Sequence, residues 1–272
     1  GLPTADTVHS FAPGLGRSAF GSSFTEVDPA NNNDSPRISY FTPNFNGLTL
    51  GVSYAPNAGN GDGTNRGINR NTGVSDILDI GVGYSQSFGN ADVSLAARWG
   101  TGSRANTPVR QDAGLDGIAG TGDDIVLAEP TLDGDPETWG VGMQVAMSGF
   151  TFGAAYAEND SGLAFNAGDT EGWSAGVSYA IDTAWTVGFE LYQGEADVGR
   201  TGANGEFSNK AEYNAFKIAA SRTMGPGVSW SVYAIQSELA VKTNDIGVIN
   251  ATGVSKYDVE STTIGTGINL TF

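Results

Sequence analysis

Few side chains in this 272-residue sequence have the types and spacing that catalysis needs. The chain has no Cys, which excludes thiolate nucleophiles and Cys-ligated zinc, and one histidine, His9, which excludes a multi-histidine metal site. His9 lies near several serines in a loop that contains Gly and Pro, so a Ser-His-Asp hydrolase stays open as an alternative. No nucleophile-elbow pattern surrounds these serines, which are Ser10, Ser18, Ser22 and Ser23.

A Gly- and Asp-rich stretch offers oxygen ligands of the kind that Ca²⁺ prefers. Its carboxylates are Asp112, Asp116, Asp123 and Asp124. Their spacing does not match the loop of an EF-hand. The two interpretations are therefore a Ca²⁺ site and a solvated acidic surface loop, and no other cofactor is expected.

The composition narrows the class of protein. Thirty acidic and 13 basic residues give a net charge of −17, which argues against nucleic acid as a partner. Forty glycines argue against a helical fold, since each glycine in a helix costs about 1 kcal/mol. No apolar run approaches the ~20 residues of a membrane-spanning helix. A membrane-spanning strand, in contrast, needs only every second residue to be apolar.

Alternation with a period of two residues is the main structural signal. In segment 139–147, bulky apolar residues occupy the odd positions, and Gly, Gln and Ala occupy the even ones. No segment shows a helical stripe. The pattern predicts eleven strands, at 37–42, 48–54, 78–84, 92–99, 139–147, 150–156, 172–181, 185–194, 216–220, 228–234 and 264–272.

Short turns and long connections alternate along the chain, which predicts an antiparallel meander. All the short turns then lie at one end of the sheet, the plain end, and all the long connections lie at the other, the elaborate end. The short turns are expected at 43–47, 88–91, 147–149, 182–184 and 223–227. The long polar connections are expected at 55–76, 102–136, 159–171, 195–210 and 240–257, where the acidic charge is expected to concentrate.

The residue types on the two faces of these strands indicate a sheet that spans a membrane. A soluble sandwich or barrel buries its bulky face and exposes a charged one, but here the opposite face is mostly Gly, Ser, Thr and Ala. Apolar residues toward lipid and small polar ones toward a water-filled lumen are typical of a transmembrane barrel. Tryptophans near the strand ends predict a membrane-interface girdle of Trp99, Trp139, Trp173, Trp185 and Trp230.

Two segments resemble the general diffusion porins of Gram-negative outer membranes, especially the alphaproteobacterial type. They are the strand-turn-strand run from Arg37 to Pro56 and the terminal run from Gly265 to Phe272, which alternates and ends in Phe. The resemblance implies a transmembrane antiparallel up-and-down β-barrel of the sixteen-stranded type. It also implies a homotrimer in the bacterial outer membrane, contact with lipid and lipopolysaccharide, no enzymatic activity, and passive diffusion of small hydrophilic solutes and ions.

The sequence departs from that family in its number of strands. Eleven strands would be the sixth to sixteenth of the family, so residues 1–36 are expected to form the pore-constriction loop and 37–272 the barrel strands. The sequence is then expected to be incomplete, or another chain to supply the missing wall. A complete twelve-stranded barrel that uses 17–26 as an extra strand is the alternative.

The candidate site is a set of charges that face one another across a pore. Strand parity places five of them on the lumen face: Arg37, Asp79, Arg98, Glu190 and Lys217. The resemblance implies acidic partners on the infolded loop, for which the candidates are Asp6, Glu26, Asp28 and Asp34. The alternative interpretation of each wall charge is an ordinary hydrated lumen residue that has no role in selectivity. Lumen-facing Tyr192, Tyr213 and Tyr233 are either a sugar-stacking track or wall packing.

Two other functions remain open on the sequence alone. The first is an outer-membrane lipid hydrolase on a twelve-stranded barrel that uses His9. The second is a soluble acidic β-rich binding module.

Overall fold

The computed structural model describes residues 36–57, 74–104, 110–112, 125–127, 134–162, 168–197, 200–202, 205–207, 209–243 and 256–271. Over these ranges the chain consists of strands and the turns between them. The same ranges contain no helix that is long and apolar enough to cross a bilayer.

Eleven strands form one sheet in which neighbours in sequence are neighbours in space. Every pairing within it is antiparallel. The prediction of eleven strands in an up-and-down meander is therefore confirmed. The strands are β1 (Ile38–Phe41), β2 (Leu48–Asn57), β3 (Val74–Phe88), β4 (Ala91–Arg104), β7 (Glu137–Met147), β8 (Phe150–Asp160), β9 (Thr170–Ala180), β10 (Trp185–Asp197), β13 (Asn209–Gly225), β14 (Val228–Thr243) and β15 (Lys256–Leu270).

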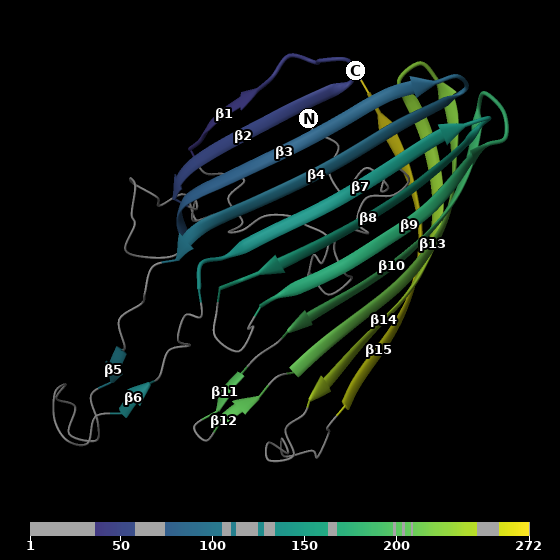
Figure 1. The fold of residues 1–272 in the computed structure, drawn as a ribbon. Coiled ribbons are helices and arrows are strands. Elements are labelled where there is room, and N and C mark those ends of the chain that lie inside the picture. Colours follow the sequence, from purple (N-terminus) through teal and green to yellow (C-terminus); the bar gives the residue numbers. More distant parts are fainter. Residues whose placement is uncertain are drawn as a thin grey trace.

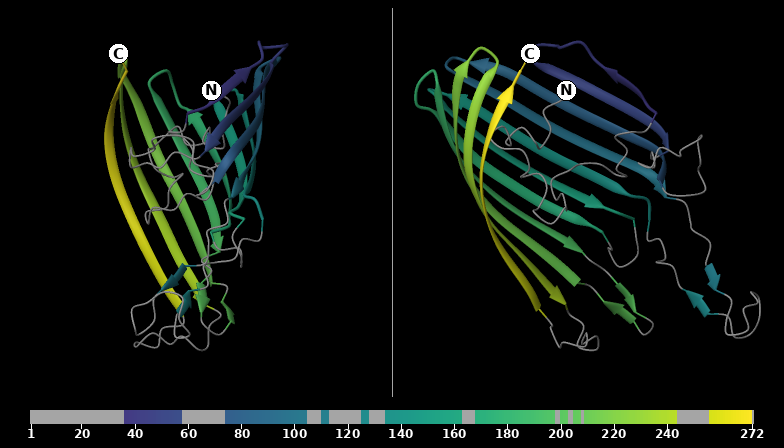
Figure 2. Two further views of the ribbon diagram at one scale, coloured as in Figure 1. Left: turned by 90° about the vertical axis from the view of Figure 1, so that its left-hand side faces the viewer. Right: turned by 180° about the vertical axis from the view of Figure 1, so that it is seen from behind.

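The sheet curls into a trough whose two edges are β1 and β15 (Figures 1 and 2). Two small ribbons extend the end of the trough that carries the long connections. One pairs β5 (Arg110–Asp112) with β6 (Ile125–Leu127), and the other pairs β11 (Arg200–Gly202) with β12 (Gly205–Phe207). The sequence prediction treated both regions as connections without strands, which was wrong.

Most strands are also longer than predicted, mainly toward the elaborate end, although β3 and β13 extend toward the plain end as well and β1 is shorter than predicted. β4 continues to Arg104, β13 begins at Asn209 and β15 begins at Lys256. The prediction stopped where apolar alternation stopped, but the hydrogen-bonded ladder requires only paired backbones.

These longer strands correct the expected location of the acidic charge. Glu158, Glu171, Glu195 and Glu212 lie inside strands, and they are successive cross-strand partners on one face of the sheet. Directly opposed like charges destabilise a sheet. Two contacts offset this in part: Tyr156 Oη donates a hydrogen bond to Glu171 Oε2 over 3.0 Å, and Lys210 forms an ion pair with Glu195.

Tight turns define the plain end of the trough. Residues 46–47 and 148–149 have positive φ angles, namely 52° and 93° in the first turn and 54° and 83° in the second. Two consecutive positive φ values are typical of the turns that best match the twist of a hairpin. In another turn, the carboxylate of Asp182 accepts hydrogen bonds from the backbone N–H of Trp185 and of Ala184, which lowers the pKa of that carboxyl group.

The bulky residues lie on the convex face rather than in a compact interior. Leu95, Val141 and Phe189 are 43%, 44% and 40% exposed. The concave face instead carries the small and polar residues, and among the described residues it holds most of the buried side chains. This arrangement confirms the transmembrane prediction and contradicts the soluble module, which needs a sealed apolar interior.

Adjacent residues on β4 provide a matched test of the two faces. Leu95 lies on the convex face, and Ser94 lies on the concave face with its hydroxyl 2.9 Å from that of Ser85. We expect Leu95→Arg to destabilise the protein in lipid by about 2–4 kcal/mol, because it places a charge in hydrocarbon. Ser94→Arg is expected to cost much less, since its side chain would reach water. Urea unfolding from bilayers measures both, and equal losses would contradict this assignment of faces.

Candidate functional site

The concave face is a floor of small residues flanked by charges. On the central strands β7, β8 and β9, the residues that face inward are mostly Gly, Ala, Ser and Thr, and Gly140, Gly153 and Gly176 are examples. Charged side chains rise on either side of this floor, from β3 and β4 on one side and from β10 and β13 on the other. The described side chains between the two sets of charges are therefore mostly short.

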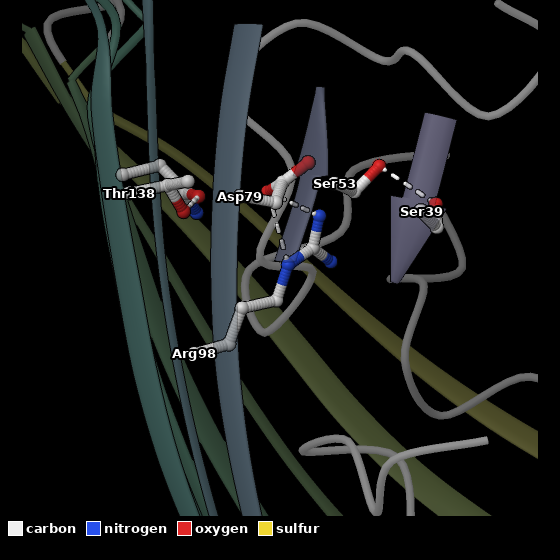
Figure 3. A network of polar contacts seen from close by, with 6 residues as sticks. Ser39, Ser53, Asp79, Arg98 and Thr138 are labelled. Carbon is white, nitrogen blue, oxygen red and sulfur yellow. Dashed lines mark hydrogen bonds and ion pairs between the residues drawn. The ribbon is translucent and has the colours of Figure 1, made fainter. Parts of the chain in front are cut away.

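Asp79 and Arg98 form the first charged pair. Arg98 Nη2 lies 2.7 Å from Asp79 Oδ1, and Arg98 Nε donates to the same oxygen over 3.2 Å (Figure 3). Gly100 is the register partner of Asp79, and a Cβ there would lie only 2.6 Å from Asp79 Oδ1. The glycine therefore makes room for the carboxylate. The Arg98 side chain remains 32% exposed on the concave face.

A row of polar side chains continues from this pair across the sheet. Register links Ser39, Ser53, Asp79, Gly100, Thr138, Asn159 and Thr170 on seven successive strands. Ser39 donates to Ser53 over 3.0 Å (Figure 3). Thr138 bonds Asn159, and Asn159 Nδ2 donates to Thr170 over 2.9 Å. The sequence prediction missed this row because its members are far apart in the chain. Strand parity combined with the correct register would have found it.

Glu190 and Lys217 form the second charged pair. They are direct register partners, and Lys217 Nζ lies 2.7 Å from Glu190 Oε2. Their side chains are only 5% and 2% exposed. A cavity of about 30 Å³, which Gly153, Gly176 and Gly188 help to line, adjoins the pair. This pair is thus a buried wall contact, which parity alone could not indicate.

The tyrosines of the concave face pack rather than form an open track. Tyr192 and Tyr213 are buried, with ring centroids 5.6 Å apart in an edge-to-face arrangement, and Ile235 and Leu239 pack against them. Tyr233 lies directly over Gly265, where a Cβ would come within 2.3 Å of the ring. These contacts favour wall packing over the sugar-stacking track.

The other predicted site residues do not lie beside the two charged pairs in the part of the chain that the structure describes. Arg37 is exposed just before β1, and Asp112 ends β5. No group of three or more metal-ligating side chains occurs among the residues that the structure describes. The other candidates lie outside the described residues: Asp6, His9, Glu26, Asp28, Asp34, Asp116, Asp123 and Asp124.

The five tryptophans lie at the two ends of the convex face. At the elaborate end, Trp99 Nε1 donates to Glu137 over 2.9 Å, Trp173 Nε1 donates to Gln193 over 3.0 Å, and Trp139 packs 5.2 Å from the ring of Tyr156. At the plain end, Trp230 Nε1 donates to Thr266 over 2.8 Å, and Trp185 packs 6.1 Å from Trp230. The arrangement is that expected of interface aromatics, which need a polar partner for each N–H.

Comparison with known proteins gives one family match. A family model described as Gram-negative porin matches residues 3–242. No curated protein sequence matches the chain.

Solved outer-membrane proteins are similar to the chain at low sequence identity. In-vitro folded OmpT, an outer membrane protein of Vibrio cholerae, is 15% identical with a TM-score of 0.50, over 99% of this chain and 74% of that one. The outer membrane channel DcaP of Acinetobacter baumannii is 11% identical with a TM-score of 0.46, over 86% and 62% of the two chains. OccK8 of Pseudomonas aeruginosa is 13% identical with a TM-score of 0.45, over 93% and 60%.

Because Glu190 and Lys217 are buried, breaking this pair is expected to lower the free energy of unfolding substantially. We expect Lys217→Met to destabilise the protein by about 3–5 kcal/mol, because it removes the positive charge that lies 2.7 Å from a buried carboxylate. The double variant Glu190→Gln, Lys217→Met is expected to recover most of that loss. Urea unfolding in detergent or lipid measures the difference.

The Asp79–Arg98 pair serves as the comparison, because its guanidinium is 32% exposed and its carboxylate 10% exposed. Arg98→Met is expected to cost less than Lys217→Met, since solvent partly screens the charge of Arg98. An equal cost for Lys217→Met and Arg98→Met, or no recovery in the double variant, would contradict a buried role for Glu190 and Lys217.

Proposed function

The chain belongs to the Gram-negative porin family, and we propose that its concave wall lines the water-filled channel, with Asp79 and Arg98 as the wall charges that passing ions meet. As a porin, it is an outer-membrane channel for the passive diffusion of small hydrophilic solutes and ions, and it is not an enzyme. The observation that carries the proposal is the contrast of faces: bulky residues cover the convex side, and small polar ones cover the concave side.

The Asp79–Arg98 pair is the better candidate for tuning ion passage. Opposite charges 2.7 Å apart on the wall create a local field across the channel, and the guanidinium keeps a third of its surface exposed. Glu190 and Lys217 are too deeply buried to meet a passing solute, so we assign them to wall stability. The acidic excess of the chain favours cations by electrostatic focusing, although salt screens distant charges beyond about 8–10 Å.

Residues 1–36 are proposed as the pore-constriction segment, with Asp6, Glu26, Asp28 and Asp34 as its acidic groups. The cluster of Tyr192, Tyr213, Ile235 and Leu239 supports this proposal. An apolar cluster on the wall of a water-filled channel needs a covering segment, because exposed apolar surface is unfavourable. The Gly- and Asp-rich stretch 112–124 stays proposed as either a Ca²⁺ site or a hydrated loop.

Closure of the wall and assembly are also proposals. Within the described residues, β1 and β15 each pair with a single neighbour in the sheet. Unpaired backbone groups at a strand edge are costly in hydrocarbon. We therefore propose that further strands complete a barrel of the sixteen-stranded type, that three such barrels associate as a homotrimer, and that the outer surface contacts lipid and lipopolysaccharide.

The hydrolase alternative has no support among the described residues. Its histidine, His9, lies outside them, and the family assignment is to a channel.

Channel activity and its wall charges are tested together in planar bilayers. The wild-type protein is expected to give ohmic conductance steps with mild cation preference. Arg98→Gln is expected to raise the cation-to-anion permeability ratio about tenfold, because removing one positive charge about 6 Å away in water favours a passing cation and disfavours a passing anion by about 0.7 kcal/mol each. Reversal potentials in a salt gradient measure this ratio.

Glu171→Gln supplies the matched control, because Glu171 is a carboxylate on the convex face. It is expected to leave the permeability ratio unchanged. A silent bilayer would contradict the channel, and equal shifts from Arg98→Gln and Glu171→Gln would contradict the role of the Asp79–Arg98 pair.

A further inference from the structure

The bases of three long connections are bonded to one another at the elaborate end of the sheet. Strands β4, β8 and β10 end there, β7 and β9 begin there, and the five lie side by side (Figure 1). Residues at and just beyond these strand ends continue to bond their neighbours. We call this set the rim, and it consists of Arg104, residues 134–136, 160–162 and 168–169, and Asp197.

Backbone hydrogen bonds extend the sheet into the rim. The N–H of Gly134 donates to the carbonyl of Gly162 over 3.4 Å, and the N–H of Asp197 donates to the carbonyl of Asp169 over 2.8 Å. Gly162 has a φ of 66°, and a Cβ there would lie only 2.5 Å from the carbonyl oxygen of Gly134. A glycine at position 162 therefore lets the first two connections approach closely.

Two aspartates add bonds from their side chains to the backbone of the rim. Asp135 Oδ1 accepts a hydrogen bond from the N–H of Arg104 over 3.0 Å, and Asp169 Oδ1 accepts one from the N–H of Ser161 over 2.7 Å. Hydrogen bonds to a carboxylate are about twice as strong as those between neutral groups. Each of the two joins the end of one strand to the segment before the next strand.

The side chain of Arg104 reaches farther than these contacts. Its Nε donates to the carbonyl of Ser161 over 2.9 Å, and the bond is partly buried. Arg104 ends β4, and Ser161 follows β8. Since β7 lies between β4 and β8, this bond joins two connections whose strands are not neighbours in the sheet.

Arg104 lies at the mouth of the trough. Arg98 and Arg104 are both even-numbered residues of β4, so strand parity places both on the concave face. Trp99, whose Nε1 donates to Glu137, marks the edge of the apolar band earlier on the same strand. Arg104 therefore lies beyond that edge, on the side of the wall that faces the channel.

We propose that Arg104 is a positioning residue that holds the rim in one arrangement and so keeps the conductance of the channel steady. The inference rests on the proposed function, because it requires a conducting channel. The side chain of Arg104 joins β4 to the end of β8, and Asp135 joins it to the start of β7. Without these bonds the rim opens locally, and its motion at the mouth modulates the ion current.

Hydrogen exchange of the folded protein in lipid nanodiscs measures this local opening. Arg104→Gln is expected to speed exchange at the amides of Gly134 and Ser161 about fivefold, which corresponds to the loss of one hydrogen bond of about 1 kcal/mol. The amide of Ala180 bonds the carbonyl of Gly149 at the plain end and serves as the internal reference. It is expected to exchange at the wild-type rate.

Single-channel recordings in planar bilayers measure the effect on conduction. Arg104→Gln and Asp135→Ala each remove one bond of the rim, so both are expected to raise the open-channel noise power about fivefold, in step with the opening. The two substitutions change the local charge in opposite directions. A direct effect of charge on passing ions therefore cannot explain an increase in both variants.

Asp135→Asn is the matched control, because it removes the same charge as Asp135→Ala but keeps an oxygen that accepts the bond from Arg104. It is expected to be as quiet as the wild type. Arg222→Gln is the control for Arg104→Gln, since Arg222 lies at the plain end, 5.4 Å from the ring of Trp185. It too is expected to be quiet. Heat-modifiable migration on gels shows that each variant is folded.

Three results would overturn the proposal. They are unchanged exchange of the rim amides in Arg104→Gln, equal noise in Arg104→Gln and Arg222→Gln, and equal noise in Asp135→Asn and Asp135→Ala. Wild-type conductance separates this inference from the channel itself. A conducting protein that stays quiet in Arg104→Gln contradicts only the positioning role, whereas a silent wild-type bilayer contradicts the proposed function.

Discussion

Every backbone N–H and C=O group that enters hydrocarbon must find its hydrogen-bond partner within the protein. This constraint explains why the chain is a meander: each strand pairs with its sequence neighbours, and short turns such as the one at Ser148 and Gly149 return the chain at once. It also explains why a chain without long apolar runs can still span a membrane. With the backbone satisfied by the ladder, only one side of each strand needs to be apolar.

The same constraint shapes the inner wall. A barrel wall one strand thick has no core, so its concave side is free to carry groups that suit water. The residues that face inward on β7, β8 and β9 are mostly small, and the charged pairs lie on either side of them. The two pairs have the same chemistry but different surroundings. Arg98 keeps 32% of its side chain exposed, so we assign its pair with Asp79 to the channel in our proposal, whereas Glu190 and Lys217 are 5% and 2% exposed and are assigned to the stability of the wall.

Much of this could be predicted from the sequence because strand parity is a local property. The face of Leu95 and the opposite face of Arg98 follow from alternation alone. The strand ends could not be predicted, because Glu171 and Glu195 look like connection residues although their backbones continue the ladder. Nor could the burial of Lys217 be predicted, since burial depends on packing between segments far apart in the chain. The polar row from Ser39 to Thr170 depends on register, which parity does not determine.

The central claim is that hydrocarbon meets the bulky face of each strand and water meets the other. Because the chain has no cysteine, single cysteines for spin labels can be introduced one at a time along β7, from Gly140 to Gln144. Collision rates with oxygen, which concentrates in lipid, and with a water-soluble nickel chelate then report the medium at each position. The account predicts that the two rates alternate in opposite phase, with oxygen favoured at Val141 and Met143 and nickel favoured at Gly142 and Gln144. The same phase for both probes, or no alternation, would contradict it.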